Sequence, residues 1–203
     1  GRELDAARQR LSVLRELEKN MDGYQNSVRA VMRAAGARRL RGVLGPVSTI
    51  LKVEPGCEVA IETALGGALQ NIVVENEAAA KAAIALLRND HAGRATFLPL
   101  DTVQPGVFRG RLSGTARLAS ALVQADPRYE NIVSNLLGRI IVVEDINEAS
   151  RVARDNGYHN KVVTMDGQVI NAGGSFTGGS APILVLPPRR GGRTVGRQPP
   201  SIV

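Results

Sequence analysis

The glycine-rich stretch Asn171–Ser180 is the segment whose composition most directly suggests a binding function. Consecutive glycine amides can surround an anion, so the stretch could form a phosphate-binding loop. The chain contains no G-x-x-x-x-G-K-[ST] pattern, however, and the stretch ends the folded part instead of leading into a helix. Glycines also let two backbones approach closely, because they carry no Cβ atom. A packing role is therefore favoured over anion binding, although a plain loop would use the same residues.

Other groups with chemical potential are scattered. His91 and His159 are far apart, and neither has a second histidine or cysteine at metal-ligand spacing. The single cysteine, Cys57, has no neighbouring base, and no G-x-S-x-G motif occurs. Paired carboxylates such as Glu144 and Asp145 fall beside expected helix starts, where they stabilise the helix dipole. The sequence therefore predicts no enzyme, no metal site and no cofactor.

Arginines near the end of the first helical segment form the best candidate for phosphate contact. They are Arg29, Arg33, Arg38, Arg39 and Arg41. Arg29 and Arg33 share one helical face. Because aromatic residues make up only 3% of the chain, base stacking is nearly excluded. We expect sequence-independent contact with a DNA backbone, with a solvated helix surface as the equally weighted alternative.

Composition bounds the remaining possibilities. The chain has 203 residues, 43% of them hydrophobic, and a net charge of +7. The positive excess lies in residues 1–41 and 181–203, whereas the middle is nearly neutral. No apolar run is long enough to span a bilayer, and the single cysteine excludes a disulfide framework. These features favour a cytoplasmic protein, and the initial Gly1 suggests a fragment of a longer chain.

Periodicity predicts a helical arm followed by two small α/β units. Residues 2–34 are typical of one helix with a moderate heptad seam. The first unit is expected to contain strands at Val47–Val53, Asn71–Val74 and Arg94–Pro99, with helices at Cys57–Leu69 and from Asn76 to Arg88. Asn76 is the expected N-cap of the second helix. Gly66 and Gly67 are expected either to cap the first helix or to allow close packing.

The second unit is expected after a connector rich in glycine, proline and serine. We expect helices at Leu118–Val123, Tyr129–Leu137 and Asn147–Asn156, and strands at Arg139–Val143, Lys161–Met165 and Gln168–Ile170. Asp166-Gly167 between two apolar runs predicts a hairpin. Prolines in residues 181–203 exclude a long helix, so we expect a disordered tail. The predicted division is 1–41 arm and junction, 42–100 first subdomain, 101–116 connector, 117–180 second subdomain and 181–203 tail.

Seven short segments in order resemble the hinge domain of SMC (structural maintenance of chromosomes) proteins. They are GVLG (42–45), AIETALG (60–66), LQNIVV (69–74), GRATFLPLD (93–101), LLG (136–138), VTMDG (163–167) and GGSFTGG (173–179). The resemblance covers about residues 20–180. It implies an α/β (α+β) fold of two subdomains, joined to coiled-coil arms whose ATP-binding heads lie elsewhere in a longer protein.

The resemblance also implies partners and site residues. Two hinges are expected to form a homodimer in which edge strands meet at a glycine-lined seam. The seam residues would be Gly173, Gly174, Ser175, Thr177, Gly178, Gly179, Gly66 and Gly67. DNA would contact the five arginines named above, at the arm junction. Kleisin and accessory subunits would bind only absent parts of the protein, and the whole would be cytoplasmic, associated with the nucleoid and with no membrane partner.

One feature departs from the family, and two other functions remain open. After Ser180 the family should resume a helical arm, whereas this chain continues with proline, arginine and glycine. A small α/β domain that binds an anion or nucleotide through the glycine stretch is the main alternative. A free nucleic-acid-binding module is the third hypothesis.

Overall fold

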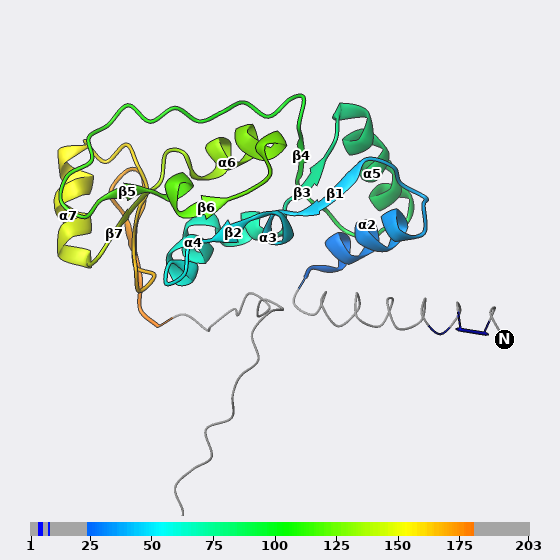
Figure 1. Cartoon of the computed structure of the whole chain (residues 1–203), viewed down its shortest axis with the longest axis horizontal. Coiled ribbons are helices and arrows are strands. Elements are labelled where there is room, and N and C mark those ends of the chain that lie inside the picture. The colour runs from blue at the N-terminus through cyan, green and yellow to red at the C-terminus, as the bar shows by residue number, and fades with distance from the viewer. Residues whose placement is uncertain (1–3, 6–7, 9–23, 181–203) are drawn as a thin grey trace, which may run out of the picture.

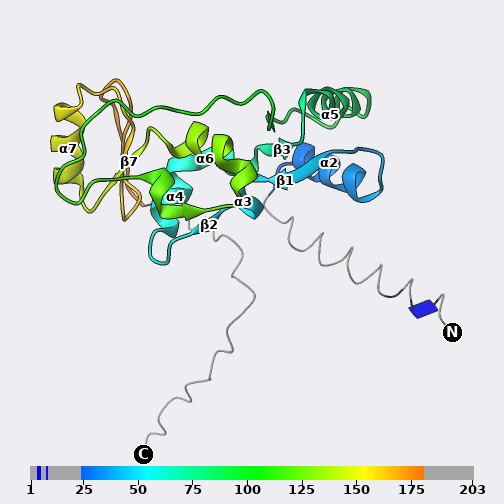
Figure 2. The ribbon, with the colours of Figure 1, turned by 45° about the horizontal axis from the view of Figure 1, so that its top comes forward.

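The computed structural model describes residues 4, 5, 8 and 24–180 (Figure 1). Residues 9–23, which carry most of the predicted heptad seam, and the predicted tail 181–203 therefore lie outside the described residues. The described part contains two main sheets, of three and five strands, with helices on both sides of each, and a separate two-stranded sheet (Figures 1 and 2).

The first sheet has three strands in the order β1-β3-β4. These are β1 (Val43–Pro46), β3 (Ile72–Val74) and β4 (Phe97–Pro99). Strands β3 and β4 are parallel, and β1 is antiparallel to β3. Helices α2 (Asn26–Gly36) and α5 (Glu77–Asn89) bury one face of this sheet in a cluster that includes Ile72 and Val74. The apolar run in β3 is buried on both faces, as expected for a central strand between layers.

The second sheet has five strands in the order β10-β9-β8-β7-β5. They are β5 (Arg117–Leu118), β7 (Ile141–Val143), β8 (Val162–Thr164), β9 (Val169–Ile170) and β10 (Phe176–Thr177). Helix α7 (Ile146–Asp155) covers one face. Helices α4 (Glu58–Leu65) and α6 (Glu130–Leu137) pack in the cluster on the other face.

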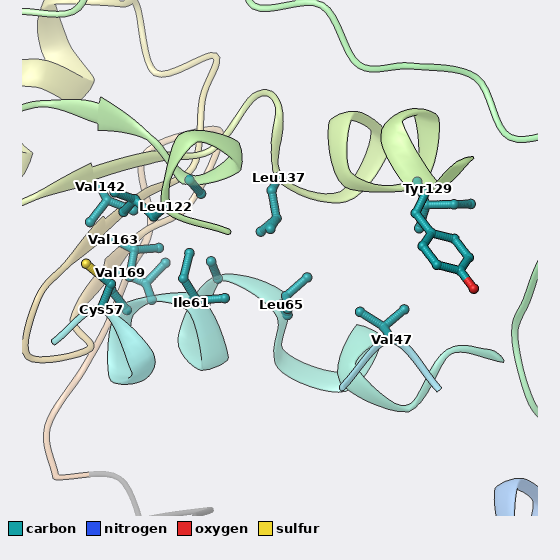
Figure 3. Close-up of a cluster of buried hydrophobic side chains, with 14 of the residues drawn as sticks. Val47, Cys57, Ile61, Leu65, Leu122, Tyr129, Leu137, Val142, Val163 and Val169 are labelled. Atoms are coloured by element: carbon teal, nitrogen blue, oxygen red, sulfur yellow. The ribbon is translucent and has the colours of Figure 1, made fainter. Parts of the chain in front are cut away.

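One hydrophobic cluster lies between the two sheets and joins them (Figure 3). It contains Val73 of the first sheet, Val142 and Val163 of the second, and Ile61 and Leu137 from the helices between. Three short elements border this cluster: α3 (Val47–Ile50) and the strand pair β2 (Lys52–Val53) and β6 (Val123–Gln124). Because the central side chains come from both halves of the chain, neither half has a complete core without the other.

The two sheets contain an internal repeat of strand, helix and parallel strand. Ile72-Val73-Val74 leads to α5, and Ile141-Val142-Val143 leads to α7. Each helix starts with an N-cap side chain: Asn76 accepts from the amide of Ala79 at 2.9 Å, and Asp145 accepts from that of Glu148 at 2.8 Å. In each unit an antiparallel strand, β1 or β5, flanks the first strand of the repeat. The second unit alone continues, through β9 and β10, beyond its parallel pair.

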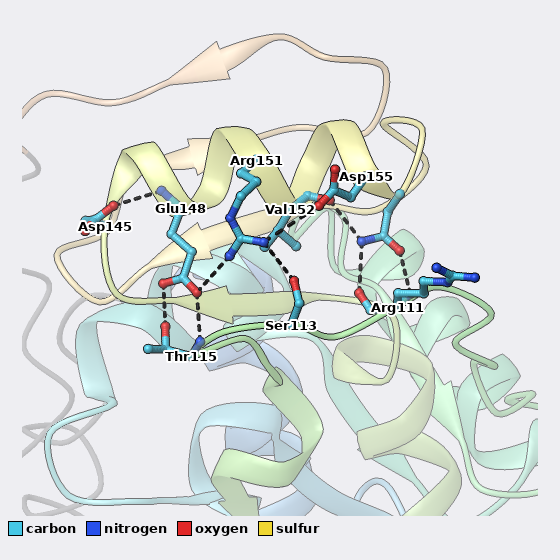
Figure 4. A network of polar contacts seen from close by, with 9 residues as sticks. Arg111, Ser113, Thr115, Asp145, Glu148, Arg151, Val152 and Asp155 are labelled. Atoms are coloured by element: carbon cyan, nitrogen blue, oxygen red, sulfur yellow. Dashed lines mark hydrogen bonds and ion pairs between the residues drawn. The ribbon is translucent and has the colours of Figure 1, made fainter.

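The connector 101–116 forms neither helix nor strand and runs along the outside of the second unit (Figure 1). Polar groups of α7 hold it (Figure 4): the Glu148 carboxylate accepts from the amide and hydroxyl of Thr115, and Arg151 donates to Ser113. The Asn156 side chain bonds both the amide and the carbonyl of Arg111. The hydrogen bond from the Thr115 hydroxyl holds the pKa of Glu148 below its usual range.

Several expected elements are confirmed. The helix capped by Asn76 is α5, the helix expected at Tyr129–Leu137 is α6, and the helix expected at Asn147–Asn156 is α7. The hairpin around Asp166-Gly167 is formed by β8 and β9. The helix expected at Cys57–Leu69 is α4 followed by the 3-10 turn Gly66–Gln70, because Gly66 has a positive φ of 52° that ends the α-helix.

Three expectations are wrong in their boundaries or type. The helix expected at 2–34 is not continuous, because Gln25 is extended and α2 begins only at Asn26. The strand expected at Val47–Val53 is instead the helical turn α3 followed by β2, since the Thr49 hydroxyl bonds the Pro46 carbonyl and curls the backbone. The segment expected as a helix at Leu118–Val123 is a 3-10 turn, Ala119–Leu122, between β5 and β6. The sequence also missed the strand β10 inside the glycine-rich stretch.

Candidate functional site

The glycine-rich stretch forms the outer edge of the second sheet. Its strand β10 pairs with β9 on one side, with Phe176 opposite Ile170 and Thr177 opposite Val169. The main-chain amide of Asn171 donates to the main-chain carbonyl of Ser175 at 2.7 Å, so the main-chain groups of Ser175 point toward β9. Main-chain groups alternate in direction along an antiparallel strand, and those of Phe176 therefore face away from β9. No described strand pairs with this outer side of β10.

Two side chains fix this edge in position. The amide group of Gln168 accepts from the Gly179 amide at 2.8 Å and donates to its carbonyl at 3.1 Å. The Asn171 side chain donates to the hydroxyls of Ser175 and Thr177, each at 3.1 Å. Both groups bond from the β9 side, so they hold the strand while leaving its outer side free. Sequence reasoning did not single out Gln168 or Asn171.

The predicted seam glycines differ in whether the backbone conformation or the space around them requires a residue without a Cβ atom. A Cβ atom at Gly178 would collide with the Gln168 side chain, and Gly173, Gly174 and Gly179 have positive φ. Gly67 has neither restriction, since a Cβ there would meet no atom within 4 Å. No contact within the described part of the chain explains why position 67 is glycine.

The geometry is poorly suited to an anion loop. The amides of Gly173 and Gly174 donate to the carbonyls of Tyr158 and Asn171, at 2.8 and 3.0 Å, and the amide of Gly179 is bonded to Gln168. A phosphate would have to displace these bonds before it could be bound by the same amides.

Gly66 and Gly67 lie on a different element, the turn that follows α4. Both are exposed. The Lys161 ammonium group donates to the Ala64 carbonyl at 3.2 Å, which ties the end of α4 to the second sheet. Burial lowers the pKa of Lys161. The structure thus attaches this turn to the sheet that carries the glycine-rich edge, although no hydrogen bond joins the two glycine groups.

The first sheet also has an open edge, formed by β4. The amide of Ile72 donates to the Thr96 carbonyl at 2.9 Å, and that of Leu100 donates to the Val74 carbonyl at 3.0 Å. The main-chain N–H and C=O groups of Thr96, Leu98 and Leu100 therefore point toward β3, whereas those of Phe97 point away from it. Pro99, which lacks an amide hydrogen, is typical of such an edge. Among the described residues no strand covers this side of β4.

The five arginines predicted to contact DNA lie on α2 and the turn that follows it. Arg38 and Arg41 are exposed, and Arg38 has a positive φ of 59°. Arg39 forms an exposed ion pair with Asp90 at 3.5 Å. The Nε atom of Arg29 is buried and has no hydrogen-bond partner. The structure thus places all five on one end of the first unit, but in different environments.

The described part contains neither a cluster of metal-ligating side chains nor a membrane-spanning helix. Among its histidine, cysteine and carboxylate side chains, no three converge on a common point. Cys57 is buried, and burial together with nearby Glu54 raises the pKa of its thiol. None of the helices that the structure describes has the length and hydropathy of a membrane span.

The fold defines an α/β domain of two main sheets whose edge strands, β10 and β4 among them, are available for association. The family model described as "SMC proteins Flexible Hinge Domain" matches residues 40–153. The chain belongs to this family of SMC hinge domains.

Curated relatives and solved structures agree with the assignment. The chromosome partition protein Smc of Desulfitobacterium hafniense is 37% identical, over 97% of this chain and 16% of that protein. The Smc protein of Bacillus subtilis is 36% identical, over 86% of this chain and 15% of that protein. The chain thus spans only about a sixth of the length of these relatives.

Among solved structures, an asymmetric dimer of the Geobacillus stearothermophilus SMC hinge domain has a TM-score of 0.76 and 36% identity, covering 88% of this chain and 75% of that one. The Pyrococcus furiosus SMC hinge domain has a TM-score of 0.66 and 28% identity, covering 80% of this chain and 84% of that one.

Proposed function

We propose that this chain is the homodimerisation hinge of a chromosome partition protein, where it links two coiled-coil arms. The observation that carries the proposal is that each sheet has open strand edges, β4 on the first sheet and β10 on the second among them. An uncovered edge presents unpaired main-chain groups, which a strand from another chain can satisfy. The related Geobacillus stearothermophilus hinge domain was solved as a dimer, which supports the same arrangement here.

The role is mechanical. Dimerisation joins the ends of two arms, so that ATP-binding heads elsewhere in the full-length protein act on a closed loop. Neither heads nor a complete pair of arms lies within the described residues, and catalysis, kleisin binding and accessory subunits belong to other parts of the protein. The site of action is the cytoplasm, at the nucleoid.

The first test concerns Gly67, because changes there leave the chain's own packing untouched. Gly67→Asp is expected to weaken the dimer at least tenfold, since it introduces bulk and charge at the proposed seam. Sedimentation equilibrium of the full chain at several concentrations would measure this, with 21.5 kDa as the mass of one copy.

Gly36→Asp is the matched control, because a Cβ at Gly36 also meets no atom within 4 Å. It should leave the dimer affinity unchanged. A wild-type chain that stayed at the mass of one copy at high micromolar concentration would rule out the proposed dimer.

We further propose that Arg29, Arg33, Arg38, Arg39 and Arg41 contact the DNA backbone weakly and without sequence preference. Arg38 and Arg41 are exposed cations, and the ion pair of Arg39 with Asp90 is exposed and thus weak enough to be exchanged for a phosphate. The low aromatic content of the chain, 3%, argues against base recognition by stacking.

Charge reversal at Arg38 and Arg41 tests this site. The double change to glutamate should lower the affinity for a duplex of roughly 30 base pairs about tenfold and reduce the slope of log K against log salt by about 2. Arg109→Glu with Arg111→Glu, which alters two exposed arginines of the connector, is the control with equal charge change. Equal losses in both variants would show that net charge matters and that this site does not.

A further inference from the structure

The connector carries a charge pattern that neither the dimer nor the DNA contact explains. Residues 102–125 contain three arginines and no acidic residue. Arg109 and Arg111 lie four and two residues before Ser113, and Arg117 lies four residues after it. A serine flanked by arginines is typical of segments that some protein kinases recognise, because carboxylates of the enzyme pair with the guanidinium groups.

The same segment has the backbone that a modifying enzyme requires. Residues 109–115 form neither helix nor strand, and all of them are exposed. Gly114, with a positive φ of 65°, turns the chain directly after Ser113, and the Ala116 amide donates to the Ser113 carbonyl at 3.2 Å. Ser113 therefore begins an exposed turn, where an enzyme can reach its hydroxyl while the domain stays folded.

The Ser113 hydroxyl already contacts a guanidinium group (Figure 4). The Nη1 atom of Arg151 on α7 donates to the Ser113 Oγ atom at 2.9 Å. The same side chain forms ion pairs with Glu148 at 3.5 Å and with Asp155 at 3.7 Å, and Arg151 and Asp155 are 45% and 53% exposed. Exposed ion pairs are weak, so the guanidinium group can exchange the contact with Asp155 for a stronger acceptor at Ser113.

The neighbouring hydroxyl lies in the opposite environment. Thr115 donates both its amide and its hydroxyl to the Glu148 carboxylate. A phosphate on Thr115 would remove the hydroxyl donor and set its negative charge against that carboxylate. The turn thus presents one hydroxyl beside a cation and one beside an anion, and only the first suits a phosphate.

We propose that Ser113 is a phosphorylation site and that Arg151 holds the phosphate. A serine kinase that prefers arginine transfers the γ-phosphoryl group of ATP to the Ser113 Oγ atom. The bond from that phosphorus to the bridging oxygen of the β-phosphate breaks, ADP leaves, and the hydroxyl proton passes to the base of the kinase. The phosphate replaces a neutral acceptor with an anion, which strengthens the hydrogen bonds from Arg151 and ties the connector more firmly to α7.

Phosphate incorporation tests the acceptor. The full chain would be incubated with ATP, Mg²⁺ and protein kinase C, a kinase that prefers basic residues on both sides of the serine. Residues 8–12 repeat the R-x-R-L-S pattern, so phosphate would be assigned to individual positions by mass spectrometry. We expect it at Ser113 and about tenfold less at Thr115. A wild-type chain without phosphate at Ser113 would overturn the site.

Two arginine variants test how the segment is recognised. Arg111→Gln should slow phosphorylation of Ser113 about tenfold, because it removes the nearest flanking arginine. Arg154→Gln removes the same charge from an exposed position of α7 and should leave the rate unchanged. Equal rates in the two variants would overturn recognition through the flanking arginines.

Titration of the phosphate tests Arg151 independently of any kinase. Phosphoserine would be installed at position 113 during translation, and its phosphorus-31 resonance followed against pH. A nearby cation favours the dianion, so Arg151→Gln should raise the pKa of the phosphate and move the titration midpoint upward by about half a pH unit. Arg154→Gln, three residues further along α7, is again the matched control. Equal midpoints in the two variants would overturn the contact with Arg151.

Proteolysis measures the consequence for the connector. Trypsin cleaves after arginine, and Arg109 lies in the exposed segment four residues before the phosphate. Phosphoserine at position 113 should slow cleavage after Arg109 about threefold, because the segment opens less often, and Arg151→Gln should abolish the slowing. Slowing that persists without Arg151 would overturn the firmer attachment to α7.

Discussion

Leu137→Ala should lower the free energy of unfolding by about 2–5 kcal/mol, the largest effect that we expect from one side chain. Leu137 is fully buried at the end of α6, in the cluster between the two sheets (Figure 3). Because that cluster includes strands of both sheets, the loss should destabilise both halves together. Thermal or urea denaturation followed by circular dichroism should still show a single transition, at a lower midpoint.

Leu112→Ala is the matched control, since the same atoms are removed from a connector residue that is 43% exposed. Its midpoint should differ little from that of the wild type. Two separate transitions in the Leu137→Ala chain would contradict a shared core. Protein concentration must be held constant throughout, because dimerisation itself raises the midpoint.

Gly138→Ala should cost about 1–3 kcal/mol, the second largest effect expected. Gly138 is buried where α6 ends, and a Cβ atom there would collide with the Ser134 carbonyl and lie 3.2 Å from that of Gly106 in the connector. Its φ of −70° is open to any residue, so crowding alone would cause the loss. Chemical denaturation of the variant would measure it.

Gly36→Ala makes the same chemical change where a Cβ would meet no atom within 4 Å. It should be neutral or slightly stabilising, because alanine reduces the entropy of the unfolded chain. If both glycine variants were equally stable, the close contact at Gly138 would be without energetic consequence.

The sequence predicted those elements whose local signals agree with their packing. Helix α5 has an N-cap, an acidic first turn and an apolar stripe, and each of these signals comes from the segment itself. The strand expected at Val47–Val53 failed because its β-branched residues belong to a turn fixed by tertiary contacts, including the bond from the Val47 amide to the Asn71 carbonyl. Strand β10 was missed because a segment rich in glycine and serine has no strand-like pattern. Its pairing with β9 is held by side-chain hydrogen bonds from Gln168 and Asn171.

The candidate site was predictable only in outline. The glycines at 66–67 and 173–179 were predicted from the resemblance to a family, and their role as a dimer seam stays a prediction. Phe97 carries no local signal, since its place on an edge strand is seen only in the folded sheet. Among the arginines, the ion pair of Arg39 with Asp90 joins residues distant in sequence, which periodicity could not reveal.

The repeat has a consequence for stoichiometry. In the described part of each chain, the edge strands β10 and β4 lie on different sheets, and neither has a neighbour on its outer side. Complementary patches of this kind generate an endless fibre unless the geometry closes the chain of contacts. In the proposed homodimer, closure at two copies would satisfy both contacts at once, and if one contact separated, the other would keep the released edges at high local concentration. One side of the proposed pair would then open for a time and reseal without its subunits parting.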